Sequence, residues 1–337
     1  MCTAISLKQD DLYFGRTLDN EFSSLEEVTV IPRNYNFNFR NGEVLKNHYA
    51  IIGMAYNKDG FPLCYDAVNE KGLCMAGLNF VGNAHYRKPE ENKVNVAQFE
   101  LIPYILGKCA NVCEAEEIIR YINITDIPFS DDLPLAELHW IIADKERAVT
   151  LESTKSGINL YENPVGVLAN NPEFPIHLEK LNDYRHLSAE NVRNTFGEGI
   201  DLKQYSKGMG AIGLPGDFSS SSRFVRAAFV KANSVCEGDE VSKVNQFFRV
   251  IGTVEPTRGV CVTDAGYNIS IYTSCCNADR GIYYYKTYDN LSITAVDMNK
   301  ENLEGEEIIK YTIIAKGIVI EQNYGTEKSL LVYFHNI

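Results

Sequence analysis

The chain is dominated by short runs of strand-forming residues that follow one another through brief polar turns. The first two runs, residues 2–7 and 11–18, are separated by Gln9 and Asp10, which predicts that the chain begins with a hairpin. This succession is typical of antiparallel neighbours and differs from the regular β-α-β alternation of a doubly wound fold. Further runs lie at residues 26–32, 49–55, 73–79, 138–144, 148–152, 267–273, 282–287, 294–297 and 310–315.

Helical periodicity is confined to a few segments between the strands. Residues 98–108, 112–122 and 222–232 repeat apolar positions at the spacing of an amphipathic helix, and a run of serines supplies capping side chains for the third. We expect loops at residues 57–66 and 127–137. Together the elements predict an α+β fold in which helices cover antiparallel sheets.

The composition is that of an ordinary globular protein with a large core. Of the 337 residues, 45% are hydrophobic and 23% are charged, and no linker interrupts the pattern, so we expect a single domain over residues 1–337. The formal net charge is −13 and no block rich in Lys and Arg is present, so we expect no nucleic-acid partner. An anionic ligand would need local arginines to overcome this field. Arg16 and Arg223 are the candidates.

The start of the chain carries early charges at Lys8, Asp10 and Asp11 and lacks an apolar run long enough for a signal peptide or a membrane span. We therefore expect a cytoplasmic protein without a membrane partner. The nine cysteines lack the paired spacing of a zinc site, and the six histidines are scattered, with His139 interpreted as a core residue. We expect no metal and no cofactor.

Cys2 is the most reactive group that the sequence offers. If Met1 is removed, this one residue carries both a thiol and a free α-amine. The two groups ionise in neighbouring pH ranges, so the amine can accept the thiol proton and no histidine is needed as a base. The alternative is that Cys2 is incidental, because small residues at position 2 favour methionine removal in any protein. The rest of the sequence has to decide between these interpretations.

Arg16 and Asp19 lie on the second strand of the predicted hairpin, within reach of Cys2 if the hairpin is tight. A guanidinium beside the sulfur favours the thiolate, and a carboxylate that accepts from the terminal ammonium fixes the orientation of that group. The alternative is an exposed ion pair of small energetic consequence.

An ordered series of motifs across nearly the whole chain resembles the choloylglycine hydrolase family, which contains bile salt hydrolases and penicillin V acylases. A single motif of this kind would be a weak signal, whereas about a dozen in order form a strong one. They are Met1-Cys2-Thr3, Phe14-Gly15-Arg16 with Asp19, Ile31-Pro-Arg-Asn34, Asn69-Glu-Lys-Gly72, Ala76-Gly-Leu-Asn-Phe80, Leu138-His-Trp140, Gly166-Val-Leu-Ala-Asn170, Gly213-Leu-Pro-Gly-Asp-Phe218, Ser222-Arg-Phe224, Tyr272-Thr-Ser-Cys275, Gly281-Ile-Tyr-Tyr-Tyr285 and Asp297-Met-Asn-Lys-Glu-Asn302.

The resemblance implies an N-terminal nucleophile hydrolase, with an αββα sandwich of two antiparallel sheets covered by helices. It implies that loss of Met1 leaves Cys2 as the nucleophile and its own amine as the proton shuttle. Arg16 would lie beside the thiol, and Asp19 would hold the amine. The reaction class is hydrolysis of a carbon–nitrogen amide bond through a thioester acyl-enzyme.

The resemblance assigns three further residues to catalysis. The backbone N–H of Asn79 and the side chain of Asn170 would donate to the oxyanion of the tetrahedral intermediate, and Arg223 would help to set the charge state of the nucleophile. Each also has a structural interpretation: Asn79 ends a strand, Asn170 stands in a turn sequence, and Arg223 follows serine caps where an arginine can be solvated.

Asn79 bears on the substrate, because an asparagine in this motif resembles bile salt hydrolases, whereas penicillin V acylases typically carry tyrosine there. The resemblance thus implies glycine- or taurine-conjugated bile acids as small-molecule substrates, and a homo-oligomer, commonly a tetramer. The alternatives are a penicillin V acylase or another N-acyl amide acylase, and a non-catalytic protein that binds steroids or lipids. An apolar groove for the steroid is expected from Leu18, Phe22, Phe61, Tyr65, Phe129 and Leu135.

Overall fold

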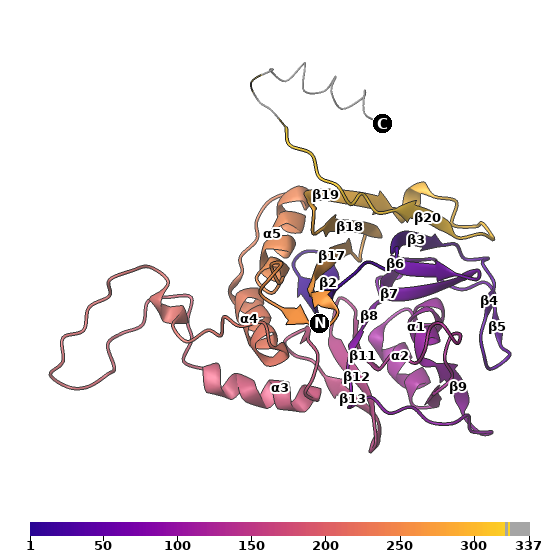
Figure 1. The fold of residues 1–337 in the computed structure, drawn as a ribbon, viewed down its shortest axis with the longest axis horizontal. Helices are drawn as coiled ribbons and strands as arrows, with labels where there is room; N and C mark the ends of the chain where they lie inside the picture. Colours follow the sequence, from indigo (N-terminus) through magenta and orange to yellow (C-terminus); the bar gives the residue numbers. More distant parts are fainter. Residues whose placement is uncertain (321–322, 324–337) are drawn as a thin grey trace.

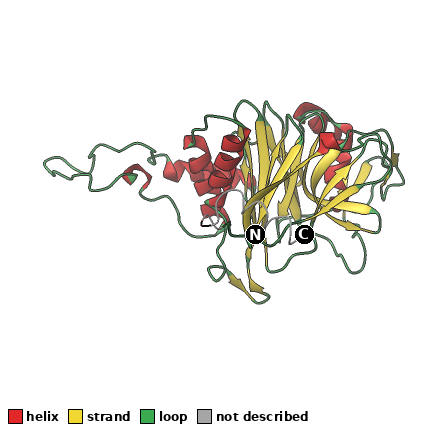
Figure 2. Ribbon diagram, turned by 90° about the horizontal axis from the view of Figure 1, so that it is seen from above, coloured by secondary structure: helices red, strands yellow, loops and turns green. Residues whose placement is uncertain are grey.

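Two antiparallel sheets lie face to face at the centre of the structure and are flanked by helices on both sides (Figures 1 and 2). The computed structural model describes residues 1–320 and 323, so residues 321–322 and 324–337 of the expected single domain lie outside the described part. The predicted α+β class and the αββα sandwich are confirmed.

The first sheet has six strands and carries the N-terminus. Its order places the opening hairpin, β1 and β2, between a short edge strand and three strands from the end of the chain. The strands in spatial order are β14 (Val167–Leu168), β1 (Cys2–Lys8), β2 (Leu12–Asn20), β17 (Ile269–Asn277), β18 (Ile282–Thr287) and β19 (Asn290–Asp297).

The second sheet has eight strands, and β20 from the end of the described chain pairs with β3 at one edge. In spatial order they are β13 (Gly157–Glu162), β12 (Ala148–Thr154), β11 (Leu138–Ala143), β8 (Cys74–Asn79), β7 (Phe61–Asn69), β6 (Ile51–Lys58), β3 (Glu27–Ile31) and β20 (Ile309–Thr312). Three short pairs lie outside the sheets: β4 (Phe37–Asn38) with β5 (Val44–Leu45), β9 (Val94–Ala97) with β10 (Ile122–Thr125), and β15 (Val262–Thr263) with β16 (Gly266–Tyr267).

Helices α4 (Ser220–Asn233) and α5 (Glu240–Gly252) cover the outer face of the first sheet, and α3 (Phe174–Lys180) packs beside α4. Helix α1 (Leu101–Lys108) covers β7 and β8 of the second sheet, and α2 (Val112–Ile119) follows it. Single 3₁₀ turns occur at Gln98–Glu100, Leu181–Tyr184, Met209–Ala211 and Met298–Lys300.

Both faces of the central strands are buried, which explains why their sequences are nearly continuous apolar runs. In β1 every residue from Cys2 to Leu7 is buried, because one face meets the second sheet and the other meets α4 and α5. In β11, successive side chains belong to different hydrophobic clusters: Ile141 packs between the sheets, and Ile142 packs beneath α1 and α2. The two-residue period of the strand thus divides the core into two layers.

The predicted loop over residues 57–66 is wrong, because it is a hairpin. Strand β6 runs to Lys58, Asp59 and Gly60 turn with φ of 51° and 75°, and β7 begins at Phe61. An Asp-Gly pair with positive φ at both positions is the turn that matches the twist of a two-stranded hairpin. The Asp59-Gly60 pair is thus a local hairpin signal within the sequence.

The other predicted elements are confirmed with shifted ends. Helix α2 stops at Ile119 because the next residues enter β10, and residues 127–137 form a loop, as expected, before β11. Helices α3 and α5 and strand β13 were not predicted. Within the described chain, no helix has the length and apolar character needed to cross a membrane.

Candidate active site

Cys2 is the first residue of strand β1, the second strand from one edge of the first sheet, and is 2% exposed. The tight hairpin pairs it with Leu18 on β2. Met1 still precedes it here, and its ammonium donates to the backbone oxygen of Asp19 at 2.8 Å, while the Asp19 N–H donates back to the Met1 oxygen at 3.0 Å. The start of the chain is therefore held in the sheet, and the reach that the hairpin prediction required is confirmed.

The Asp19 carboxylate is 2% exposed and accepts hydrogen bonds from two hydroxyl groups. Ser270 Oγ donates at 2.6 Å and Thr17 Oγ1 at 3.1 Å. Burial raises the pKa of this carboxyl, and the charges of Arg223 and of the N-terminal ammonium oppose that rise. Asp19 is thus a buried carboxylate that interacts with the charge of the Met1 ammonium, and its role toward the amine of Cys2 stays a prediction.

Arg16 is 1% exposed and crosses from the first sheet to the second. Its guanidinium donates to backbone oxygens of Thr17 at 3.1 Å and Tyr65 at 3.2 Å, and also to Gly77 O. Burial opposes the charged form, but the negative charge of an ionised Cys2 and those of nearby acids leave the pKa of Arg16 above its ordinary value. The interpretation of Arg16 and Asp19 as an exposed ion pair is therefore wrong, because both side chains are buried.

Arg223 projects from the first turn of α4 and is fully buried. It donates to the backbone oxygen of Cys2, to Thr3 Oγ1, and at 2.7 Å to Asn170 Oδ1. Burial lowers the pKa of its guanidinium, and the negative charges of Asp19 and of an ionised Cys2 oppose that effect. A solvated Arg223 is excluded, and the arginine contacts the backbone of Cys2.

Asn170 joins Cys2 to the second sheet. Its Oδ1 accepts from the Cys2 N–H at 2.8 Å as well as from Arg223, and its Nδ2 donates to the backbone oxygen of Asn79 at 2.7 Å. Because both partners of Oδ1 are donors, the orientation of the amide is determined. One Nδ2 hydrogen is left to point elsewhere, which is what an oxyanion donor requires.

Several residues that support Asn170 were not found from the sequence. The Asn170 N–H donates to Ser220 Oγ at 2.8 Å, and His177 Nε2 lies 2.8 Å from its backbone oxygen. His139 is a fully buried core residue, as interpreted, and lies 2.8 Å from the oxygen of Ala169 and 3.0 Å from Glu152 Oε1. These contacts join elements that are far apart in the chain, so no local motif predicts them.

The structure separates the six residues predicted to line an apolar groove. Leu18 belongs to the same hydrophobic cluster as Cys2, and Tyr65 packs against it. Phe61 and Phe129 pack on each other in the other cluster, with ring centroids 6.2 Å apart. The remaining two, Phe22 and Leu135, are 63% and 39% exposed. The groove stays a prediction.

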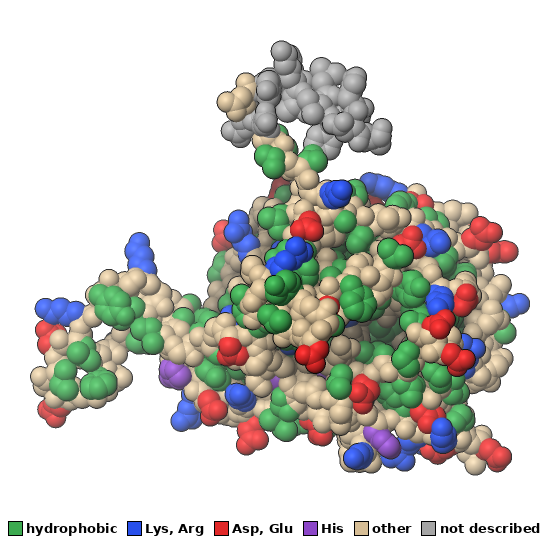
Figure 3. Space-filling view, in the orientation of Figure 1, with side chains coloured by type: hydrophobic (Ala, Val, Ile, Leu, Met, Phe, Trp, Pro, Cys, Tyr) green, Lys and Arg blue, Asp and Glu red, His purple; other side chains and the backbone are tan. Residues whose placement is uncertain are grey.

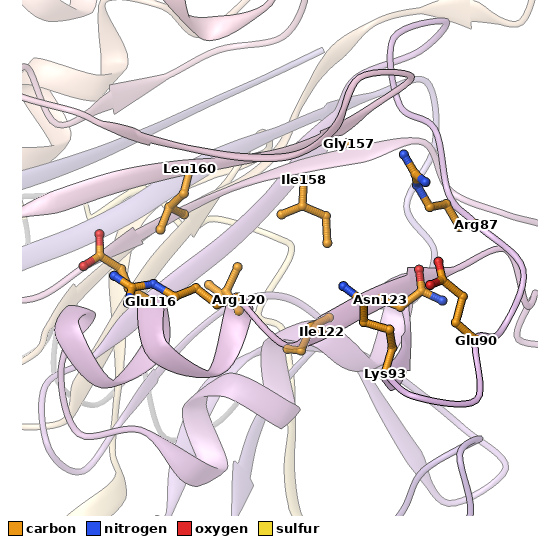
Figure 4. A pocket seen from close by; sticks show the side chains of 11 residues that line it. Arg87, Glu90, Lys93, Glu116, Arg120, Ile122, Asn123, Gly157, Ile158 and Leu160 are labelled. Atoms are coloured by element: carbon orange, nitrogen blue, oxygen red, sulfur yellow. The ribbon is translucent and has the colours of Figure 1, made fainter.

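A separate cavity of about 590 Å³ lies among α2, β10 and β13, and its wall includes none of the six predicted catalytic residues (Figure 4). Arg87, Lys93 and Arg120 surround it together with isoleucine and leucine side chains. Among the described residues, no group of three or more His, Cys, Asp or Glu side chains is placed to hold a metal ion.

Comparison with known proteins finds similarity over nearly the whole chain. A family profile described as linear amide C–N hydrolases, choloylglycine hydrolase family, matches residues 2–311. A bile salt hydrolase/transferase of Lactiplantibacillus plantarum is 51% identical over 314 residues, which cover 93% of this chain and 97% of the relative.

Two solved structures are similar in fold. The C2A mutant of conjugated bile acid hydrolase from Clostridium perfringens superposes with a TM-score of 0.89 at 36% identity, covering 96% of this chain and all of the other. A penicillin V acylase from Agrobacterium tumefaciens gives a TM-score of 0.74 at 20% identity, covering 95% of this chain and 94% of the other, and shows the shared fold alone.

Proposed function

This chain belongs to the choloylglycine hydrolase family of linear amide C–N hydrolases, and from that membership we propose that it is a bile salt hydrolase. It would cleave the amide bond that joins a bile acid to glycine or taurine. The observation that carries the proposal is the placement of Cys2 at the start of β1, with its backbone held by Arg223 and Asn170. The 51% identity to a bile salt hydrolase/transferase supports the substrate class.

The proposed reaction begins with removal of Met1, which converts the Cys2 peptide nitrogen into an α-amine. The amine takes the thiol proton, and the thiolate attacks the amide carbonyl. Negative charge then develops on the substrate oxygen. The free Nδ2 hydrogen of Asn170 and the backbone N–H of Asn79 would stabilise it, each worth roughly 3–4 kcal/mol of barrier.

The ammonium then protonates the leaving glycine or taurine nitrogen, the carbon–nitrogen bond breaks, and a thioester remains on Cys2. Water, deprotonated by the regenerated amine, attacks the thioester and releases the bile acid. Asp19 would keep the amine oriented, because its carboxylate is already fixed by Ser270 and Thr17.

The steroid is proposed to lie on an apolar surface beside Cys2, and Leu18 and Tyr65 are its best-supported walls. Phe22 and Leu135 offer exposed apolar side chains that a bound lipid could cover. Phe61 and Phe129 already pack against each other, so we expect them to support the wall of the groove and not to contact the steroid.

Purified protein tests the assignment when it is incubated separately with glycocholate and with phenoxymethylpenicillin. Faster turnover of glycocholate is expected, whereas faster turnover of the penicillin would show that the chain is a penicillin V acylase. Cys2→Ala separates an enzyme from a binding protein of the same fold. The variant should lose nearly all turnover, and it should still bind the bile salt.

We also propose that the chain forms a homo-oligomer, with a tetramer as the expected form. A long excursion, residues 188–212, projects from the body of the molecule and presents apolar side chains to solvent (Figures 1 and 3). Exposed apolar surface of this kind is typical of protein interfaces. Light scattering coupled to gel filtration would measure the mass, and a monomer would contradict the proposal. The apolar residues are Val192, Phe196, Ile200, Leu202, Tyr205 and Ile212.

A further inference from the structure

Asp66 is a buried carboxylate that joins the two sheets next to the active site. It lies on β7 of the second sheet and is 1% exposed, and its hydrogen-bond donors come from the first sheet. Tyr272 donates to Oδ1 at 2.6 Å, and Tyr283 and Ser274 donate to Oδ2 at 2.7 and 3.0 Å. A carboxylate with three hydroxyl donors is held in one position, because each donor is itself buried in a strand.

The same group of residues holds Arg16. Ser274 Oγ, which donates to Asp66, also accepts the backbone N–H of Arg16 at 3.0 Å. The guanidinium donates to the backbone oxygen of Tyr65, the neighbour of Asp66 on β7. In the described structure the guanidinium of Arg16 donates its hydrogen bonds to backbone oxygens and not to a carboxylate. Its positive charge is therefore balanced by nearby groups to which it donates no hydrogen bond, namely Asp66, Asp19 and an ionised Cys2.

Charge balance explains why a second carboxylate is present. Once Met1 is removed, the site holds three cations, namely the ammonium of Cys2, Arg16 and Arg223. Asp19 and Asp66 supply two negative charges, so an ionised thiol brings the sum to zero. Buried charges are costly unless they are balanced, so this composition favours a site in which thiolate and ammonium coexist.

The other titratable groups around Asp66 stay neutral in the working range. Burial raises the pKa of Cys64 to about 12 and raises those of Cys276, Tyr272 and Tyr283 well above their ordinary values. Asp66 differs from these groups in its partners. Burial raises the pKa of its carboxyl as well, but the charge of Arg16 and the three hydroxyl donors oppose that rise.

Near the nucleophile, the partly exposed carboxylate of Glu21 interacts with the charge of the N-terminal ammonium. Cys261 is a further titratable neighbour. Its pKa is raised by burial, and it interacts with the charges of Arg223 and Asp19. The buried charged side chains of the site are therefore the two arginines and the two aspartates, which act together with the amine.

We propose that Asp66 is a positioning residue for amide hydrolysis, which anchors Arg16 between the sheets and sets the pH range over which Cys2 attacks. This proposal depends on the proposed function in one respect only, which is that the turnover assay uses a bile salt as the substrate. Removing the negative charge leaves one net positive charge near the sulfur, so the thiolate forms at lower pH. A unit charge acting over roughly 10 Å at an effective dielectric constant of about 20 shifts such an equilibrium by about one pH unit.

The test is Asp66→Asn, measured in two ways. The pH dependence of kcat/KM on glycocholate should show its acid limb moved about one unit toward lower pH. The rate of Cys2 alkylation by iodoacetamide, followed by mass spectrometry of the N-terminal peptide, should move by the same amount. Alkylation needs no turnover, so it tests Asp66 even if the chain hydrolyses a different amide and the proposed function fails.

Two tyrosine variants complete the design. Tyr283→Phe removes one donor to Asp66 and should move the alkylation profile in the same direction by less. Tyr285→Phe is the matched control, because this buried hydroxyl on the same strand accepts from the Ile314 N–H at 2.9 Å and is not a partner of Asp66. It should leave the profile unchanged.

The proposal is overturned if folded Asp66→Asn protein has the alkylation profile of the unmodified chain, or if Tyr285→Phe shifts the profile as much as Asp66→Asn does. If Asp66→Asn does not fold, Tyr283→Phe decides, and a profile identical to that of the unmodified chain then overturns the proposal. A shift in alkylation without glycocholate turnover supports Asp66 and refutes the substrate.

Discussion

Asn170→Ala is the substitution that most directly separates catalysis from stability at this site. It removes Oδ1, which accepts from the Cys2 nitrogen at 2.8 Å and from Arg223 at 2.7 Å, and Nδ2, which donates to Asn79 O. Each buried donor left without its partner costs about 1–3 kcal/mol, more where it is charged. The loss of stability should therefore be about 2–5 kcal/mol.

The effect on catalysis should be larger than that loss alone implies. If the free Nδ2 hydrogen donates to the oxyanion, its removal lowers kcat by roughly 100- to 1000-fold even in protein that is fully folded at the assay temperature. The KM for glycocholate should change little, because the donor acts in the transition state. Steady-state kinetics at a temperature well below the unfolding midpoint would measure both constants.

Asn163→Ala is the matched control for this experiment. Asn163 is also a buried asparagine, it donates to Thr150 Oγ1 at 3.0 Å and to Val167 O at 2.9 Å, and it accepts from the Gly166 N–H at 2.8 Å. It should lose a similar amount of stability and keep kcat within a few-fold. A kcat for Asn170→Ala no lower than that of Asn163→Ala would refute the role of Asn170 in the transition state.

Three further outcomes are expected. An extra residue retained ahead of Cys2 should abolish turnover while leaving the thermal unfolding midpoint nearly unchanged, because only the amine is blocked; intact mass and a glycocholate assay would check this. Burial lowers the pKa of His177 to about 4, so the unfolded chain binds a proton that the folded chain does not, and stability falls as pH falls from about 6.5 to about 4. His177→Gln should reduce that loss in acid denaturation curves. Burial also lowers the pKa of Lys231 to about 8 from 10.5, so stability rises with pH between these values, and Lys231→Met should be more stable at pH 7 with a gain that shrinks toward pH 10 in thermal melts.

Much of the fold was predictable because its strands carry local signals. The opening hairpin, strands β8 and β11, and helices α1 and α4 were predicted from apolar runs and periodicity. The hairpin between β6 and β7 was missed because its Asp59-Gly60 turn was interpreted as part of a loop. Helix α5 was missed although Asp239 caps it by accepting from the Ser242 N–H, a signal that the sequence does contain.

By itself, the sequence identified the chemistry: a thiol and an amine on one residue, and arginine, aspartate and asparagine residues in motifs that resemble one family. Those are properties of residue type and order, and they can be recognised without a structure. Only the tertiary structure decided which groups meet. Arg223 reaches the Cys2 backbone across 221 positions of the chain, and Asp66 meets Tyr283 across 217. Such contacts depend on how two sheets pack face to face, and no local pattern records that packing.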